Sequence, residues 1–102
     1  MTTELATPGT IFVSTWGYDQ TNVDFHQVTR STAHSIWLKP IRSATVEAAG
    51  WGAKVVAVPD SFCGSEFRRR PQRVEGKLYA RIDTVSCARP WDGEPVHRST
   101  WA

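Results

Sequence analysis

Six side chains with the chemistry to recognise a ligand fall within the stretch "STWGYDQTNVDF", residues 14–25. Two of them are aromatic and offer flat faces for stacking, while the others are carboxylates and amides that offer hydrogen-bond acceptors and donors. Loops between strands commonly carry the binding groups of small β-domains. The stretch therefore predicts a surface that reads a base, a nucleotide or a peptide, made of Trp16, Tyr18, Asp19, Gln20, Asn22 and Asp24.

The same stretch also has the composition of a turn. Asp and Asn side chains cap the backbone of their own turn, and Gly17 supplies conformational freedom. Trp16 would then belong to the hydrophobic core. On the sequence alone, the structural and the binding interpretations both stay open.

Residues with catalytic or metal-binding spacing are missing from the sequence. There is no glycine-rich phosphate loop, no His-x-x-x-His and no nucleophile elbow. Asp19 and Asp24 have no spacing that acid–base chemistry requires, and no further acidic residue follows nearby to complete a divalent cation site. Cys63 and Cys87 lack zinc-finger spacing. We therefore expect a protein that is not an enzyme and has no catalytic residue, metal or cofactor.

A basic segment forms the second candidate site. The formal net charge of +2 is too small to indicate a nucleic-acid partner, but half of the 12 Lys and Arg residues fall between residues 68 and 81. Such a cluster can contact a phosphate backbone or an acidic protein face. Its alternative is a solvated loop that only keeps the protein soluble. The predicted contact residues are Arg68, Arg69, Arg70, Arg73, Lys77 and Arg81.

Two large aromatic residues in the polar C-terminal segment form the third candidate. Trp91 and Trp101 either fold back over the core or stay exposed and anchor a partner. We expect folding back, since a small core gains from a cover, and keep both residues as candidate partner anchors.

Short β-rich segments separated by Gly and Pro predict the elements that position these residues. Strands are expected over residues 10–16, 22–30, 34–49, 53–59 and 77–86, with a bulge near Gln27 and a bulge or sheet edge at Pro40. Residues 59–76 are expected to form a long loop. The prediction is an all-β domain, a single five-stranded antiparallel barrel of the Src-homology-3-like or Tudor-like type, possessing at most one short helical turn. The alternative is an α+β fold with a short helix near residues 44–49.

One domain accounts for the whole chain of 102 residues. Residues 1–9 are expected to be a flexible N-terminal arm, and residues 10–102 the barrel with its aromatic tail. The start of the chain lacks the pattern of a secretory signal, and no apolar run reaches the length of a membrane span. We therefore expect a cytoplasmic protein, no membrane partner and two reduced cysteines, although a disulfide between Cys63 and Cys87 stays open.

The phrase "WGYDQTNVDFHQV" resembles a motif of small uncharacterised proteins from actinobacterial phages and plasmids, in which an aromatic residue usually stands in place of His26. The segment "ARPWDGEPV" is similar to a tail that recurs in the same group. The resemblance covers the antiparallel hairpin expected from the strands at residues 10–16 and 22–30 well, the tail moderately and the middle of the chain weakly. It implies an origin in a mobile element and, for a phage protein, the cytoplasm of the host cell. It implies no activity.

These observations lead to two hypotheses. The first is a non-enzymatic binding module for a polyanionic ligand, either nucleic acid or a nucleotide. The second is a protein that inhibits a host factor or defence system, or a structural phage protein, and acts through its aromatic tail.

Overall fold

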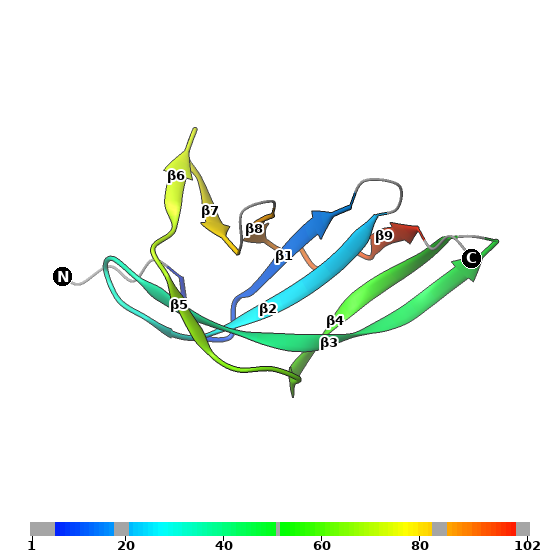
Figure 1. Cartoon of the computed structure of the whole chain (residues 1–102), viewed down its shortest axis with the longest axis horizontal. Coiled ribbons are helices and arrows are strands. Elements are labelled where there is room, and N and C mark those ends of the chain that lie inside the picture. Colours follow the sequence, from blue (N-terminus) through cyan, green and yellow to red (C-terminus); the bar gives the residue numbers. More distant parts are fainter. Residues whose placement is uncertain (1–5, 18–20, 51, 83–85, 100–102) are drawn as a thin grey trace.

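Strands make up all the regular secondary structure in the part of the chain that the computed structural model describes, residues 6–17, 21–50, 52–82 and 86–99 (Figure 1). This confirms the all-β prediction. No helix occurs in these residues, and residues 44–49 are extended rather than helical. The strands are β1 (Ile11–Trp16), β2 (Asn22–Ser31), β3 (Ile36–Ala49), β4 (Gly52–Phe62), β5 (Phe67–Arg69), β6 (Gln72–Val74), β7 (Lys77–Arg81), β8 (Cys87–Pro90) and β9 (Val96–Ser99).

The strands form one antiparallel sheet that curls into a half-barrel. Its order is β6-β7-β8-β1-β2-β3-β4-β9, and β5 pairs with the first residues of β3 (Figure 1). The predicted five-stranded barrel is not confirmed, because the segments expected to be a loop and a tail add four further strands. β5 and β6 lie within residues 59–76, and β8 and β9 lie within residues 87–102. Each of the four has only three or four residues, too few for a clear alternation of apolar and polar side chains.

Two hydrophobic cores lie on opposite faces of the central strands β1, β2 and β3. Neighbouring residues of a strand point to opposite faces, so Phe12 enters the first core and Val13 the second. β5, β7 and β8 cover the first face, and β4, β9 and Trp91 cover the second. The first core consists of Phe12, Val28, Ile36, Leu38, Leu78, Ala80 and Ala88, and the second of Val13, Phe25, Ile41, Val55 and Ala57.

The long strands β2 and β3 each contribute to both cores, and the pairing between them contains a bulge. The register between them shifts between Val28 and Arg30, close to the bulge predicted near Gln27. Phe25 and Val28 are three positions apart on the unbroken side of this shift, so alternation places Phe25 in the second core and Val28 in the first. Pro40 of β3 pairs with His26 of β2. On the opposite edge of β3, the residues before Pro40 pair with β5 and the residues after it pair with β4. A sheet edge tolerates a residue without an N–H donor, as the sequence predicts for this proline.

A four-residue excursion interrupts β4 where the sequence predicts its end at Pro59. The pairing with β3 passes from Ser43–Ala57 to Ile41–Phe62, so residues 58–61 leave the ladder. The Gln27 side chain holds this excursion: its Nε2 donates to Asp60 Oδ1, and the Asp60 N–H donates to Gln27 Oε1, both at 2.8 Å. The buried amide of Gln27 thus provides hydrogen-bond partners for both the backbone N–H and the side chain of Asp60. Asp60 has a φ of 64°, a left-handed conformation that Asp tolerates better than most residues.

The described part of the N-terminal arm, residues 6–9, lies against β2. Gly9 N–H donates to the Val28 carbonyl at 2.8 Å, and Ala6 N–H donates to Ser31 Oγ at 3.2 Å. Ala6 also packs against the first core.

Candidate functional site

The opening stretch places one aromatic ring on the surface. Trp16 is 42% exposed and does not belong to either core. Its indole Nε1 donates to Asp24 Oδ2 at 2.5 Å, and Asn22 is its partner across the β1–β2 hairpin. The hydrogen bond occupies the polar edge of the indole and leaves its flat face available for contact. Three of the predicted binding residues, Tyr18, Asp19 and Gln20, lie outside the described residues.

The Arg69 side chain bonds to backbone carbonyls of the protein itself, whereas the sequence suggests that it contacts a ligand. Its Nε donates to the Arg81 carbonyl at 2.8 Å and its Nη2 to the Ile82 carbonyl at 2.9 Å, which ties β5 to the end of β7. Its Nη1 donates to the Arg68 carbonyl, and its guanidinium lies 4.5 Å from the centre of the Phe67 ring. Three carbonyl oxygens and an aromatic face therefore engage this cation within the protein.

Four of the predicted basic residues line two hollows that are also lined by Tyr79, a residue not selected from the sequence. Leu78 and Ala80 are buried in the first core, so Tyr79 between them points outward together with Lys77 and Arg81. Tyr79 lines a hollow of about 290 Å³ with Arg70 and Arg81, and another of about 440 Å³ with Arg73 and Lys77. The alternation in "KLYAR" already indicates that these three side chains share a face, and this was the available signal.

The larger of these two hollows forms because β7 and β8 diverge. Within the described strands, their pairing covers Ala80–Ala88 and Arg81–Cys87 and does not extend to Tyr79. Arg89 and Pro90 of β8 then line the far wall of the hollow. Arg89 also borders a third hollow, of about 270 Å³, whose lining includes Asp92 and Glu94. We call the surface formed by Arg70, Arg73, Lys77, Tyr79 and Arg81 the basic face.

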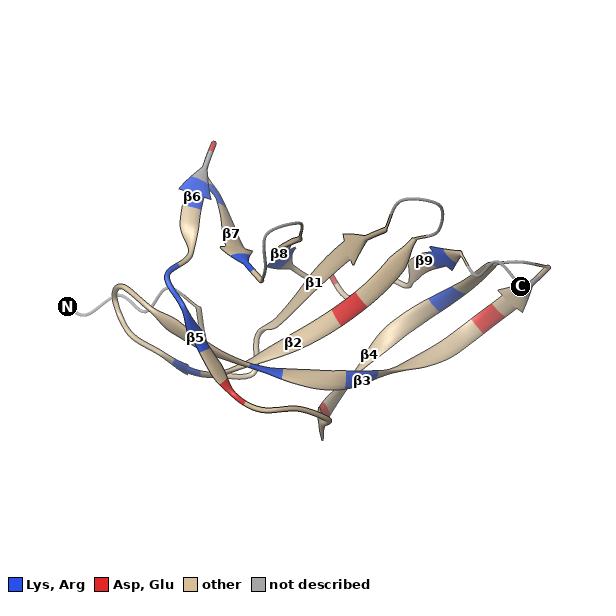
Figure 2. Cartoon of the chain, viewed as in Figure 1, with Lys and Arg blue, Asp and Glu red and all other residues tan. Residues whose placement is uncertain are grey.

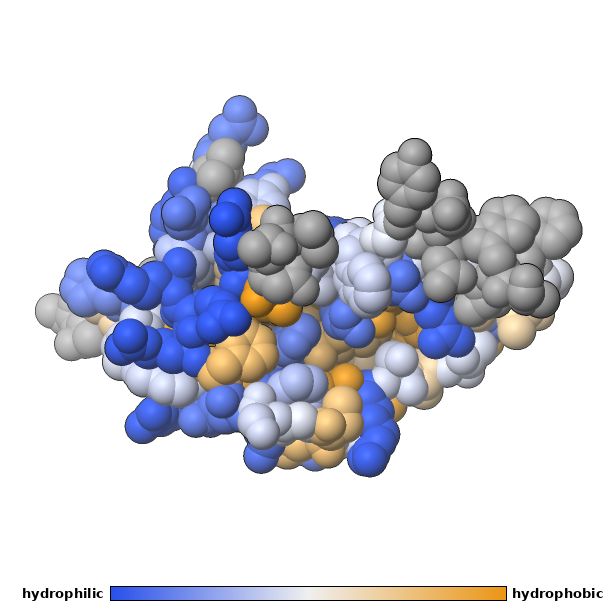
Figure 3. All heavy atoms as spheres, in the orientation of Figure 1, coloured by the Kyte–Doolittle hydropathy of each residue, from blue (hydrophilic) through white to orange (hydrophobic). Residues whose placement is uncertain are grey.

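Positive charge on the basic face is not neutralised by ion pairs within the described part of the chain. Its four cations are exposed, and none of them pairs with a described carboxylate. Among the acidic residues of these segments, Glu75 lies in the turn between β6 and β7, and Glu66 accepts a hydrogen bond from the Thr29 hydroxyl. Figure 2 shows Lys and Arg along β5, β6, β7 and β8, and Figure 3 shows hydrophilic residues over β5, β6 and β7.

The remaining predicted contact residue, Arg68, lies apart from this face. It is exposed on β5, where its partner on β3 is Trp37. Trp37 in turn has the Arg30 guanidinium 4.2 Å from its ring centre.

The opening stretch and the basic face occupy different surfaces. Trp16 points to the same side of β1 as Phe12, which is the side that β7 and β8 cover. Tyr79 points away from that core. The structure therefore does not join the described residues of the two predicted sites into one surface.

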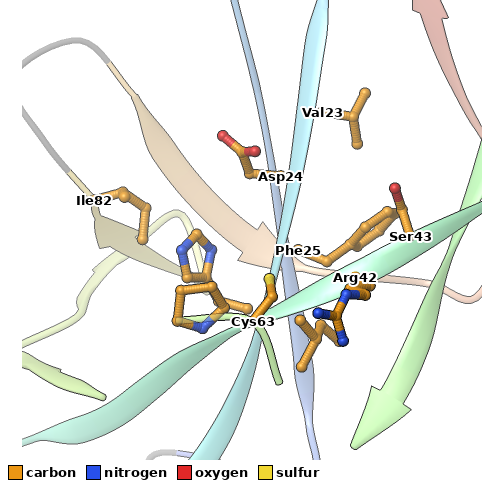
Figure 4. A pocket seen from close by; sticks show the side chains of 10 residues that line it. Val23, Asp24, Phe25, Arg42, Ser43, Cys63 and Ile82 are labelled. Atoms are coloured by element: carbon orange, nitrogen blue, oxygen red, sulfur yellow. The ribbon is translucent and has the colours of Figure 1, made fainter. Parts of the chain in front are cut away.

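A further hollow of about 480 Å³ lies over β2 and β3 and is lined by Asp24, His26, Arg42, Cys63 and Ile82, among others (Figure 4). His26 is 6% exposed, its ring packs edge-on against Phe67 with centroids 5.4 Å apart, and its Nδ1 has no hydrogen-bond partner. Burial lowers the pKa of the His26 imidazole below its ordinary value of 6.5, although the Asp24 carboxylate acts in the opposite direction.

Trp91 covers the second core. It is half-buried and meets Phe25 edge-on, with ring centres 5.2 Å apart. Its indole Nε1 donates to the Glu94 carbonyl and its backbone N–H to the Ile11 carbonyl, both at 2.8 Å. Trp101, the other predicted anchor, lies outside the described residues.

Cys63 and Cys87 are both exposed and free, so the disulfide left open by the sequence is not formed. The described residues contain no group of three or more His, Cys, Asp and Glu side chains arranged to hold a metal ion. They also contain no helix with the length and apolar character to cross a membrane.

Comparisons with models of protein families, with curated proteins and with solved structures find no match to this chain.

Proposed function

We propose that this protein is a non-enzymatic binding module for a polyanionic ligand, nucleic acid or a nucleotide, and that the ligand lies on the basic face. The observation that supports this proposal is the set of four exposed cations around two neighbouring hollows, without described carboxylates to neutralise them. Lys and Arg side chains in such a set attract phosphates and gain affinity when counterions are released.

Only some of the basic residues predicted from the sequence are proposed as phosphate contacts. Arg69 is left out because its guanidinium bonds to three backbone carbonyls. Arg70 and Arg81 from the smaller hollow, and Arg73 and Lys77 from the larger, are the proposed phosphate contacts. Trp16, Asn22 and Asp24 form a separate surface that would contact only an extended ligand.

We also propose that the protein originates from a phage or other mobile element and acts in the cytoplasm. Both points rest on the resemblance of "WGYDQTNVDFHQV" and on the composition of the chain. The alternative, a protein–protein inhibitor that uses its aromatic tail, gains no support from Trp91, whose ring packs on Phe25.

Salt dependence of binding tests the proposal. Labelled single-stranded and duplex DNA and a labelled nucleoside triphosphate are titrated with the protein over a series of salt concentrations. We expect log K to fall linearly with log salt for at least one probe, and Arg81→Ala or Lys77→Ala each to reduce the slope by roughly 1. Lys54→Ala, an equal charge change at an exposed position of β4, is the control and should leave the slope unchanged. Salt-independent binding, or no binding to any probe, contradicts the proposal.

A further inference from the structure

Tyr79 occupies the one position of the basic face that charge attraction does not explain. Its ring is half-buried and borders both hollows, of which Arg70 and Arg81 line the smaller and Arg73 and Lys77 line the larger. A phosphate-binding surface that recognises charge alone has no use for an aromatic side chain between its cations.

The β-strand holds this ring in place. Leu78 and Ala80 on either side are anchored in the first core, and Gln72 of β6 is the cross-strand partner of Tyr79. An aromatic side chain fixed in this manner loses little conformational entropy when a planar group stacks on it. The adjoining hollow of about 440 Å³, between the diverging strands β7 and β8, lies within the usual size range of small-ligand pockets.

An outward-pointing aromatic ring together with exposed cations is the combination of side chains that binds single-stranded nucleic acid. Proteins bind single-stranded nucleic acid by stacking unpaired bases on aromatic side chains while cations follow the backbone on either side. A duplex keeps its bases stacked on one another, so an outward-pointing ring such as that of Tyr79 has no base to contact. A free nucleotide would need only one of the two groups of cations.

We infer that the ligand of the basic face is single-stranded nucleic acid, with an unpaired base stacked on Tyr79 and phosphates on either side bound by Arg70 and Arg81 and by Arg73 and Lys77. This inference rests on the proposed function and names its ligand. Because every base has a flat face, binding is expected to depend little on sequence.

The test compares labelled oligothymidylate of about 12 nucleotides, within the range of single-strand site sizes, with its oligoadenylate duplex at the same salt concentration. The single strand is expected to bind more tightly. Tyr79→Leu should weaken single-strand binding about 5- to 150-fold, the usual effect of losing one stacking contact. The salt slope should stay unchanged, since no cation is removed. Tyr79→Phe keeps the ring and should bind as the unmodified protein does, and the melting temperatures of both variants show whether they are folded.

The outcomes separate this inference from the proposed function. Duplex binding that equals or exceeds single-strand binding, or full single-strand binding by folded Tyr79→Leu, overturns the inference and leaves polyanion binding standing. Binding of the nucleoside triphosphate as tight as that of the oligonucleotide overturns it as well. If none of the probes binds, the proposed function fails together with the inference.

Discussion

At the scale of single residues, the structure assigns different roles to side chains that look alike in the sequence. Arg69 and Arg70 are neighbours, yet Arg69 bonds to backbone carbonyls while Arg70 lines an exposed hollow. No local pattern distinguishes them, because the carbonyls that Arg69 contacts belong to residues 81 and 82, more than ten positions away. The sequence could identify the cluster but not which of its members would be free to bind.

His26 is the residue for which a pH dependence is expected. Its pKa is lower in the folded protein than in the unfolded chain, mainly because burial disfavours the charged ring. The unfolded chain therefore binds a proton more strongly, and stability present above pH 6.5 is lost as the pH falls toward the lower folded pKa. The melting temperature of the protein should therefore decrease as the pH is lowered from about 8 to about 5.

His26→Phe should flatten that decline because it removes the titrating ring while retaining an aromatic side chain against Phe67. His34→Gln, at an exposed position, serves as the control and should keep the decline. Equal pH profiles for the unmodified protein and His26→Phe would rule out His26 as the cause.

At the scale of elements, long segments with clear alternation were predictable and short ones were not. The positions of β1, β2 and β3 agree with the sequence prediction, and β7 agrees at its start but ends at Arg81, short of the predicted residue 86. β5 and β9 take their strand conformation from pairing with β3 and β4, partners that lie far away in the chain. Arg70 and Arg73 were expected in a loop, so only the shared face of Lys77, Tyr79 and Arg81 could be recognised, from the alternation of the strand.

β5 depends on Arg69 for its connection to β7. Arg69→Lys keeps the positive charge but cannot place two donors on the Arg81 and Ile82 carbonyls at once. We expect this variant to lower the free energy of unfolding by about 1–3 kcal/mol, the usual effect of losing hydrogen bonds from a charged group. Urea denaturation measures it, and Arg68→Lys, next to it on β5, should change stability by less than about 0.5 kcal/mol. Equal losses for both variants would argue against the role of Arg69 as a tie.

At the scale of the whole molecule, the two cores are mechanically linked because they share the strands β1, β2 and β3. Weakening either core should therefore lower the stability of the entire domain. The outer strands β7 and β4 each belong to one core, and so offer positions at which the two cores can be weakened separately.

Leu78→Ala in the first core is expected to cost about 2–5 kcal/mol, and Val55→Ala in the second about 1–3 kcal/mol. Circular dichroism and tryptophan fluorescence, to which Trp91 on the second core contributes, should report one coincident transition for each variant. Val46→Ala, at a position 55% exposed, should have little effect. Separate transitions for the two probes in Leu78→Ala would show that the cores unfold independently.

The outward side of β7 has an evolutionary consequence. The central strands are constrained on both faces, so most changes there disturb one core or the other. On β7 the constraint falls only on Leu78 and Ala80, while Lys77, Tyr79 and Arg81 contact neither core. Changes at those three positions leave both cores intact, and selection can therefore alter what this surface recognises while the scaffold stays the same.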